Sequence, residues 1–174
     1  MFPDPGSLPQ KAKAREDENY TFRHFLKHQT KLASEQVDKQ VFELEAKVWK
    51  RIDCTKCANC CRVISPVLSE EDVTRLASHL GITSAEFVAK YLAPSKDEPD
   101  FPWIMREKPC PFLKDNRCSV YEHRPQAFRG YPYLNKDKFV FRTLGMIERL
   151  SECPAVFEVW EELKSATGFR YRGR

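Results

Sequence analysis

A cluster of four cysteines within eight residues constrains this chain more than any other feature. Residues 54–61 read Cys-Thr-Lys-Cys-Ala-Asn-Cys-Cys, and three more cysteines follow at positions 110, 118 and 153. Thiols at this density exceed the needs of core packing. A metal ion, an iron–sulfur cluster or disulfides must therefore hold them. The interval of Cys54, Cys57 and Cys60 favours a metal, because a tight turn lets both sulfurs of a Cys-x-x-Cys pair bind one ion.

The composition argues against a disulfide framework. The number of cysteines is odd, and the N-terminal residues lack the basic and apolar regions of a secretory signal. No run of residues is long and apolar enough for a membrane span. We therefore expect a cytoplasmic protein without a membrane partner, in which thiols stay reduced and bind metal.

The adjacent pair Cys60 and Cys61 limits how many thiols one ion can take. In an extended segment the two side chains point to opposite sides, whereas in a helix Cys54, Cys57 and Cys61 share a face that Cys60 leaves. Either the pair divides between two ions, or one of the two thiols lies beside an ion without binding it. The later cysteines complete the coordination, so the predicted ligands are Cys54, Cys57, Cys60, Cys61, Cys110, Cys118 and Cys153.

Seven thiols fall one short of two sites with four thiolates each. A bridging thiolate, a His or carboxylate side chain, or water would fill the gap. His123 is the nearest imidazole in sequence, although an ordinary loop histidine is the stronger interpretation. His24 and His28 have metal spacing but no acidic partner pattern, so we expect them to be structural.

The pattern of apolar, capping and breaking residues predicts a mainly helical α+β fold. Its helices surround an irregular, metal-stapled cysteine-rich core with one or two short hairpins. An apolar stripe from Phe22 to Val48 predicts helix with a break near Ser34 as N-cap. Capping boxes at 69–72 and 83–86 open two helices, and Pro154 begins another. Residues 110–121 predict a hairpin and residues 138–142 a strand.

The same pass along the chain suggests four parts. Residues 1–15 are expected to be a flexible arm and residues 16–53 a helical segment. Residues 54–168 are expected to form the cysteine-cluster metal-binding domain. Residues 169–174 are a basic tail.

The motifs as a set resemble a known family. The order is Cys54-x-x-Cys57-x-x-Cys60-Cys61-Arg62, then Cys110-Pro-Phe-Leu, Cys118-Ser-Val-Tyr-Glu-x-Arg124-Pro, Arg129-x-Tyr-Pro and Cys153-Pro. This resembles the CxxCxxCC cysteine-cluster family of zinc- or iron-chelating domains, whose members are often labelled iron–sulfur oxidoreductases. The family usually places a cysteine where this chain has Phe128. The resemblance implies that Arg124 and Arg129 could pair with bound sulfur or a carboxylate.

Three functions follow from these patterns. The first is a module that chelates zinc or iron and presents a surface to a protein partner. The second is an iron–sulfur-cluster oxidoreductase or redox protein. The third is a zinc-stabilised nucleic-acid-binding module with a tail of arginine and tyrosine, but the net charge of +4 favours nucleic acid only weakly. We favour the first, and the sequence leaves catalysis and the oligomeric state open.

Overall fold

The computed structural model describes residues 4–96 and 99–173, and it divides the chain into two compact units. Unit 1 consists of residues 1–54 and 132–174, and unit 2 consists of residues 55–131. The chain therefore enters unit 2 from unit 1 and returns to it. This division differs from the four parts expected from the sequence, because the last two helices belong with the first three. In the described part of the chain, α-helices and small antiparallel sheets form a mainly helical α+β fold, as predicted.

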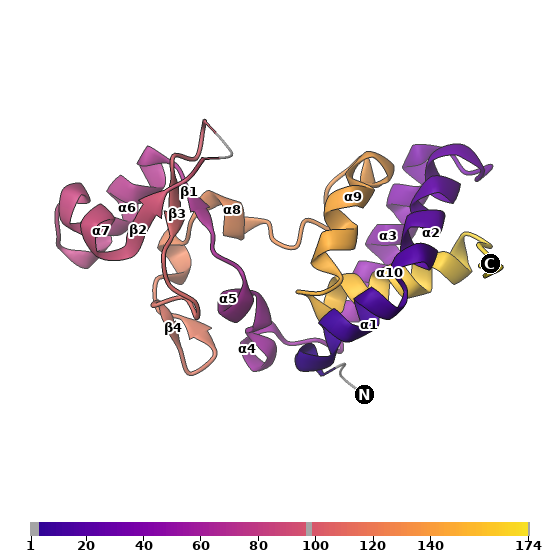
Figure 1. The fold of residues 1–174 in the computed structure, drawn as a ribbon, viewed down its shortest axis with the longest axis horizontal. Coiled ribbons are helices and arrows are strands. Elements are labelled where there is room, and N and C mark those ends of the chain that lie inside the picture. Colours follow the sequence, from indigo (N-terminus) through magenta and orange to yellow (C-terminus); the bar gives the residue numbers. More distant parts are fainter. Residues whose placement is uncertain (1–3, 97–98, 174) are drawn as a thin grey trace. The chain divides into compact units, whose positions relative to one another are not determined.

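Unit 1 is helical. It contains the 3-10 turn η1 (Pro5–Ser7) and the helices α1 (Leu8–Ala14), α2 (Glu16–His28), α3 (Ser34–Trp49), α9 (Phe139–Arg149) and α10 (Pro154–Ala166). Helix α3 packs on α10, and α2 packs on α9 (Figure 1). The predicted apolar stripe is core, with Phe22, Val41 and Val48 fully buried. The break falls where expected, although Ala33 is the N-cap and Ser34 is the first helical residue.

Aromatic rings fill the centre of unit 1. The indole of Trp160 meets the Phe22 ring edge-on, with 5.1 Å between ring centroids. Its N–H donates to Asn19 Oδ1 at 3.0 Å, which satisfies the buried polar end of the indole. Phe169 packs on Phe22 with 5.0 Å between ring centroids, so the segment expected to be a basic tail begins in the core.

Two sequence-based expectations in unit 1 are wrong. Residues 8–14 of the expected flexible arm form α1, which buries Leu8 completely. The expected strand at 138–142 is the start of α9, whose buried positions Phe139, Thr143 and Met146 repeat at helical spacing. The cause lies far away in the sequence, because the Asp38 carboxylate accepts hydrogen bonds of 2.8 Å from the amides of Lys138 and Phe139. This carboxylate caps the helix N-terminus.

Unit 2 combines short helices with two small sheets. Its elements are α4 (Cys54–Cys57), α5 (Asn59–Val63), β1 (Val67–Leu68), α6 (Glu70–Leu80), α7 (Ser84–Tyr91), β2 (Leu92–Pro94), β3 (Trp103–Met105), β4 (Leu113–Lys114), β5 (Arg117–Cys118), η2 (Tyr121–His123) and α8 (Gln126–Arg129). The three-stranded sheet has the order β1-β3-β2, and β4 pairs with β5 as a hairpin. All three strand pairings are antiparallel, and Leu113 lies opposite Cys118.

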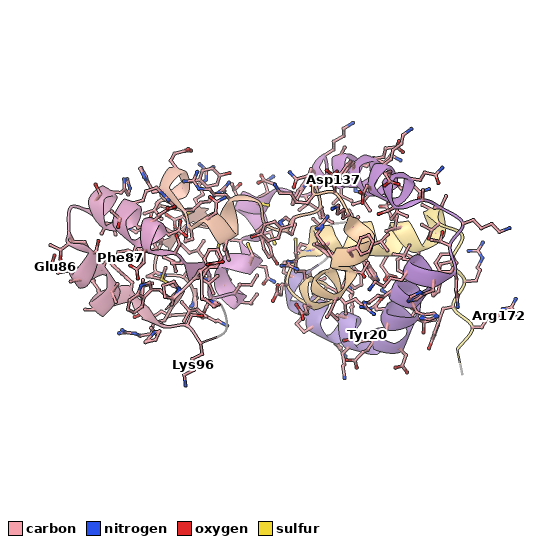
Figure 2. The ribbon with its side chains drawn as sticks, turned by 90° about the horizontal axis from the view of Figure 1, so that it is seen from above. Tyr20, Glu86, Phe87, Lys96, Asp137 and Arg172 are labelled. Atoms are coloured by element: carbon pink, nitrogen blue, oxygen red, sulfur yellow. The ribbon has the colours of Figure 1, made fainter. Side chains whose placement is uncertain are left out.

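Unit 2 has a hydrophobic core of its own. Helices α6 and α7 pack together beside the three-stranded sheet (Figure 1). They enclose buried side chains that include Leu76, Phe87, Leu92 and Met105. Both predicted capping boxes are present, at Ser69–Asp72 and Thr83–Glu86. Figure 2 shows Phe87 turned into the unit and Glu86 turned outward from the same helix.

No helix in the described ranges 4–96 and 99–173 is long and apolar enough to cross a membrane.

Candidate metal centre

A sharp backbone turn brings the clustered cysteines of unit 2 together. Helix α4 ends at Cys57, and α5 begins two residues later at Asn59. Ala58 between them is 4% exposed and adopts the left-handed conformation, with φ 48° and ψ 19°. A residue with a Cβ atom pays about 1–2 kcal/mol for this conformation. The strained turn keeps 54–63 from forming one continuous helix, and it sets the direction from which Cys60 and Cys61 leave the backbone.

Cys61 is the centre of a group of four thiols. Its charge acts on Cys57, Cys110 and Cys118, and it contributes to a raised pKa in each of these three side chains. Its carbonyl oxygen accepts a hydrogen bond of 2.9 Å from the amide of Cys110. Three separate segments of the chain therefore supply thiols to one location. We refer to Cys57, Cys61, Cys110 and Cys118 as the thiol group.

Cys118 lies on strand β5 of the short hairpin, Cys110 lies in the loop before β4, and both pack against the core of unit 2. Burial is the main cause of the raised pKa of both thiols, and that of Cys110 reaches about 11. Burial disfavours the thiolate because a charge loses its hydration there. A bound cation would reverse that preference, since a coordinating thiol is deprotonated outright.

The sulfur atoms of Cys60 and Cys61 lie 3.9 Å apart. The hydrogen bond from Cys60 is the main cause of a lowered pKa of Cys61, at about 7, and the charges of Arg62 and Arg124 lower it further. The same hydrogen bond requires Cys60 to be protonated when Cys61 is a thiolate.

Two guanidinium groups accompany the thiol group, and hydrogen bonds to backbone carbonyl groups hold both. Arg62 donates to the carbonyl of Cys57 at 2.7 Å and to the Asn116 side chain. Arg124 stacks on the Tyr121 ring, with its Cζ 4.0 Å from the ring centroid, and donates to the Arg129 carbonyl at 3.3 Å. These cations lie where thiolate charge would accumulate.

A buried carboxylate fixes the segment that carries Arg124. Asp72 is 1% exposed and accepts hydrogen bonds from the amide of Gln126 at 3.1 Å and from the Arg75 guanidinium. Arg75 also donates to the carbonyls of His123 and Arg124 at 3.4 and 3.2 Å. Side-chain hydrogen bonds from helix α6 thus hold residues 123–126, which are not part of either sheet.

The other candidate ligands are two cysteines and three histidines. Cys54 begins α4, the helical turn that ends at Cys57, and the boundary between the units falls directly after it. Cys153 belongs to unit 1, is 8% exposed and precedes α10. The rings of His24 and His28 are 4.8 Å apart between centroids, also in unit 1. His123 stacks on His79 with 4.0 Å between centroids. Phe128, at the position of the expected eighth cysteine, stacks on Tyr131 at 5.5 Å.

The donor chemistry suits a thiophilic ion, but the present spacing does not yet enclose one. Across residues 4–96 and 99–173, no three side chains of His, Cys, Asp or Glu are placed to hold a metal ion as they stand. Four thiols from one small region nevertheless match the ligand types that bind zinc and iron in proteins. Binding would require the thiol group to close around the ion.

The comparison with protein families gives one match, which covers residues 53–145 and thus more than half of the chain. The chain belongs to the CxxCxxCC family. The description of this family is "Putative zinc- or iron-chelating domain", and metal binding is the general function that membership supports. The comparisons with curated proteins and with solved structures gave no match. The CxxCxxCC match includes all of unit 2 and ends before Cys153.

Sequence reasoning missed the polar side chains that hold this site. The sequence pattern identifies Asp72 only as part of a capping box. In the structure it also accepts a hydrogen bond from the amide of Gln126, the first residue of α8, 54 positions away. The Arg62–Asn116 contact also joins residues 54 positions apart. The one local signal was the Asp115-Asn116 turn, since asparagine tolerates the left-handed conformation that it adopts here with φ 62°.

Proposed function

We propose that unit 2 binds one zinc or iron ion through the thiolates of Cys57, Cys61, Cys110 and Cys118. The observation that carries the proposal is the central position of Cys61, which interacts with three thiols from three segments. A site with four thiolates is a common form of structural zinc site, with Zn–S bonds of about 2.3 Å. The bound ion would supply the positive charge that stabilises thiolates in this half-buried location.

The protein contributes to this chemistry through charge and burial. A divalent ion with four thiolates carries a net charge of −2, and the guanidinium groups of Arg62 and Arg124 offset it. Burial against the core keeps competing water away from Cys110 and Cys118. Binding must release the proton of Cys110, whose pKa is about 11, so the affinity for the ion should rise with pH.

Three of the seven predicted ligands are not ligands in this proposal. Cys60 lies beside the ion and donates its hydrogen bond to Cys61. The proposed group contains only Cys61 and the three thiols on which its charge acts, so Cys54 and Cys153 stay outside it. We place the protein in a reducing compartment such as the cytoplasm, where these thiols stay available to metal.

Metal analysis of protein purified without oxygen tests the proposal directly. We expect about one zinc or iron ion per chain and its loss when Cys57, Cys61, Cys110 or Cys118 is replaced singly by serine. Cys153→Ala is the matched control, because it removes a cysteine of unit 1 and should leave the metal content unchanged. Full metal content in Cys61→Ser would contradict the assignment.

A second candidate is an iron–sulfur or redox centre, which the close Cys60–Cys61 pair favours. Four thiolates also hold iron–sulfur clusters. The lowered pKa of Cys61 gives it thiolate character near neutral pH, as in reactive cysteines. Acid-labile sulfide and broad visible absorption that oxygen bleaches would support the cluster. Colourless protein that contains zinc alone would rule it out.

A further inference from the structure

We propose that Arg62 is a positioning residue that holds two of the three thiol-bearing segments of unit 2 together before an ion binds. This inference rests on the proposed metal site and concerns how the site is built. The three segments are the α4–α5 turn, the loop at Cys110 and the β4–β5 hairpin. Arg62 lies on α5, directly after Cys61, and contacts groups on two of the three.

The first contact fixes the turn between the helices. Arg62 Nη1 donates a hydrogen bond of 2.7 Å to the carbonyl oxygen of Cys57. Cys57 ends α4, and the left-handed Ala58 follows it. The contact therefore spans the strained turn and ties the end of α4 to α5. It sets the positions of Cys57 and Cys61 relative to each other.

The second contact fixes the hairpin. Arg62 Nη2 donates to the side-chain oxygen of Asn116, which lies in the turn between β4 and β5. Asp115 and Asn116 both have positive φ, 48° and 62°, as a tight hairpin turn with right-handed strand twist requires. Cys118 follows two residues later on β5. One guanidinium therefore connects the turn that carries Cys57 to the hairpin that carries Cys118.

A backbone bond adds the third segment. The amide of Cys110 donates to the carbonyl of Cys61 at 2.9 Å, so the segment before the hairpin is held to α5. Cys110 and Cys118 also pack against the apolar core of unit 2. Hydrogen bonds and apolar packing thus connect the segments that carry all four thiols. In this proposal they act together with the metal that the sequence analysis expects to staple these loops.

The two contacts use the two outer nitrogens of the guanidinium group, Nη1 and Nη2. One planar group with two outer nitrogens reaches two acceptors on different segments at a fixed angle. A lysine ammonium carries the same charge but cannot keep both directions fixed. Arg62→Lys therefore separates a positioning role from one of charge compensation.

The test compares three variants of the full chain by their affinity for Zn²⁺, measured in competition with a chromophoric chelator under anaerobic conditions. We expect Arg62→Lys and Asn116→Gly to bind Zn²⁺ about 10- to 100-fold more weakly, as is typical when a group that orients metal ligands is lost. Glycine fits the φ of 62° at position 116, so this variant removes the acceptor and keeps the turn. Asp115→Gly is the control, because it makes the same kind of change at the neighbouring turn position and should bind like the original protein.

A second measurement needs no metal. Hydrogen exchange at the Cys110 amide reports its bond to Cys61, and it should accelerate in metal-free Arg62→Lys and Asn116→Gly but not in Asp115→Gly. Equal Zn²⁺ affinity in the original protein and Arg62→Lys, with unchanged exchange at Cys110, would overturn the positioning role. If the original protein binds no Zn²⁺ or Fe²⁺ while exchange still accelerates in the variants, the proposed metal site fails and the positioning role stands.

Discussion

Replacing Asp72 by alanine should destabilise unit 2 more than any other single change at a capping residue. The carboxylate is 1% exposed. It accepts from the amides of Ser69 at 3.3 Å and Gln126 at 3.1 Å, and from the Arg75 guanidinium. Its removal leaves two amides without an acceptor and one guanidinium without its counter-charge. Both amides are only partly buried, so each unpaired amide costs up to about 3 kcal/mol.

The guanidinium adds less than a fully buried cation would, because 31% of the Arg75 side chain is exposed and water can reach it. We therefore expect Asp72→Ala to lower the free energy of unfolding by about 3–5 kcal/mol, the range measured when one partner of a buried ion pair is removed. The matched control is Glu86→Ala in the second capping box of the same unit. Glu86 accepts the equivalent hydrogen bond from the Thr83 amide at 2.8 Å but lies on the surface. Glu86→Ala should therefore lower the free energy of unfolding clearly less than Asp72→Ala does.

Urea unfolding with 5-fluorotryptophan resolves the response of unit 2, since Trp103 lies there and Trp49 and Trp160 lie in unit 1. The ¹⁹F signal of Trp103 should shift its midpoint strongly in Asp72→Ala and weakly in Glu86→Ala. A loss below about 1 kcal/mol in Asp72→Ala, or equal losses in the two variants, would refute the reasoning from burial.

Three further predictions concern the turn, the thiols and the core. Ala58→Gly should change the stability of unit 2 by less than about 1 kcal/mol, because relief of the left-handed strain offsets the lost methyl group and the greater chain entropy. Ala58→Val should cost about 2 kcal/mol or more in thermal melts, because a branched side chain adds strain and crowding. In metal-free protein, iodoacetamide should label Cys61 at half its maximal rate near pH 7 and Cys110 only as the pH approaches 11, as peptide mass spectrometry can show. The raised pKa of Cys110 contributes stability below the pKa of an unfolded thiol, about 8.5, and this contribution is lost as the pH rises toward 11. Trp160→Phe should destabilise unit 1 by about 1–3 kcal/mol in urea titrations, since it leaves buried Asn19 Oδ1 without its donor; a neutral effect would mean that water replaces the indole N–H.

Local signals in the sequence predicted local structure well. Ser69 and Thr83 as N-caps and Pro154 as the start of α10 are all confirmed. Each works through bonds or backbone angles within a few residues, so the neighbouring sequence contains the whole cause.

Contacts between distant residues decided what the sequence did not show. Residues 138–142 contain the aromatic and β-branched residues that favour a strand, but Asp38 caps them as a helix from 100 positions away. The sequence did not predict the division into two units for the same reason. Helix α3 packs on α10, although all of unit 2 separates them in the sequence. The composition of the clustered motif predicted metal binding. It did not predict which thiols gather around Cys61, since folding of the hairpin and its contact with Arg62 decide that.

The order of the segments has a consequence for synthesis on the ribosome. Residues 55–131 emerge from the ribosome as a complete set before the final helices of unit 1 emerge. Domains generally fold as units while the chain grows, at about 5–20 residues per second. We therefore expect unit 2 to fold, and to be exposed to metal ions, before α9 and α10 are available to bury α2 and α3.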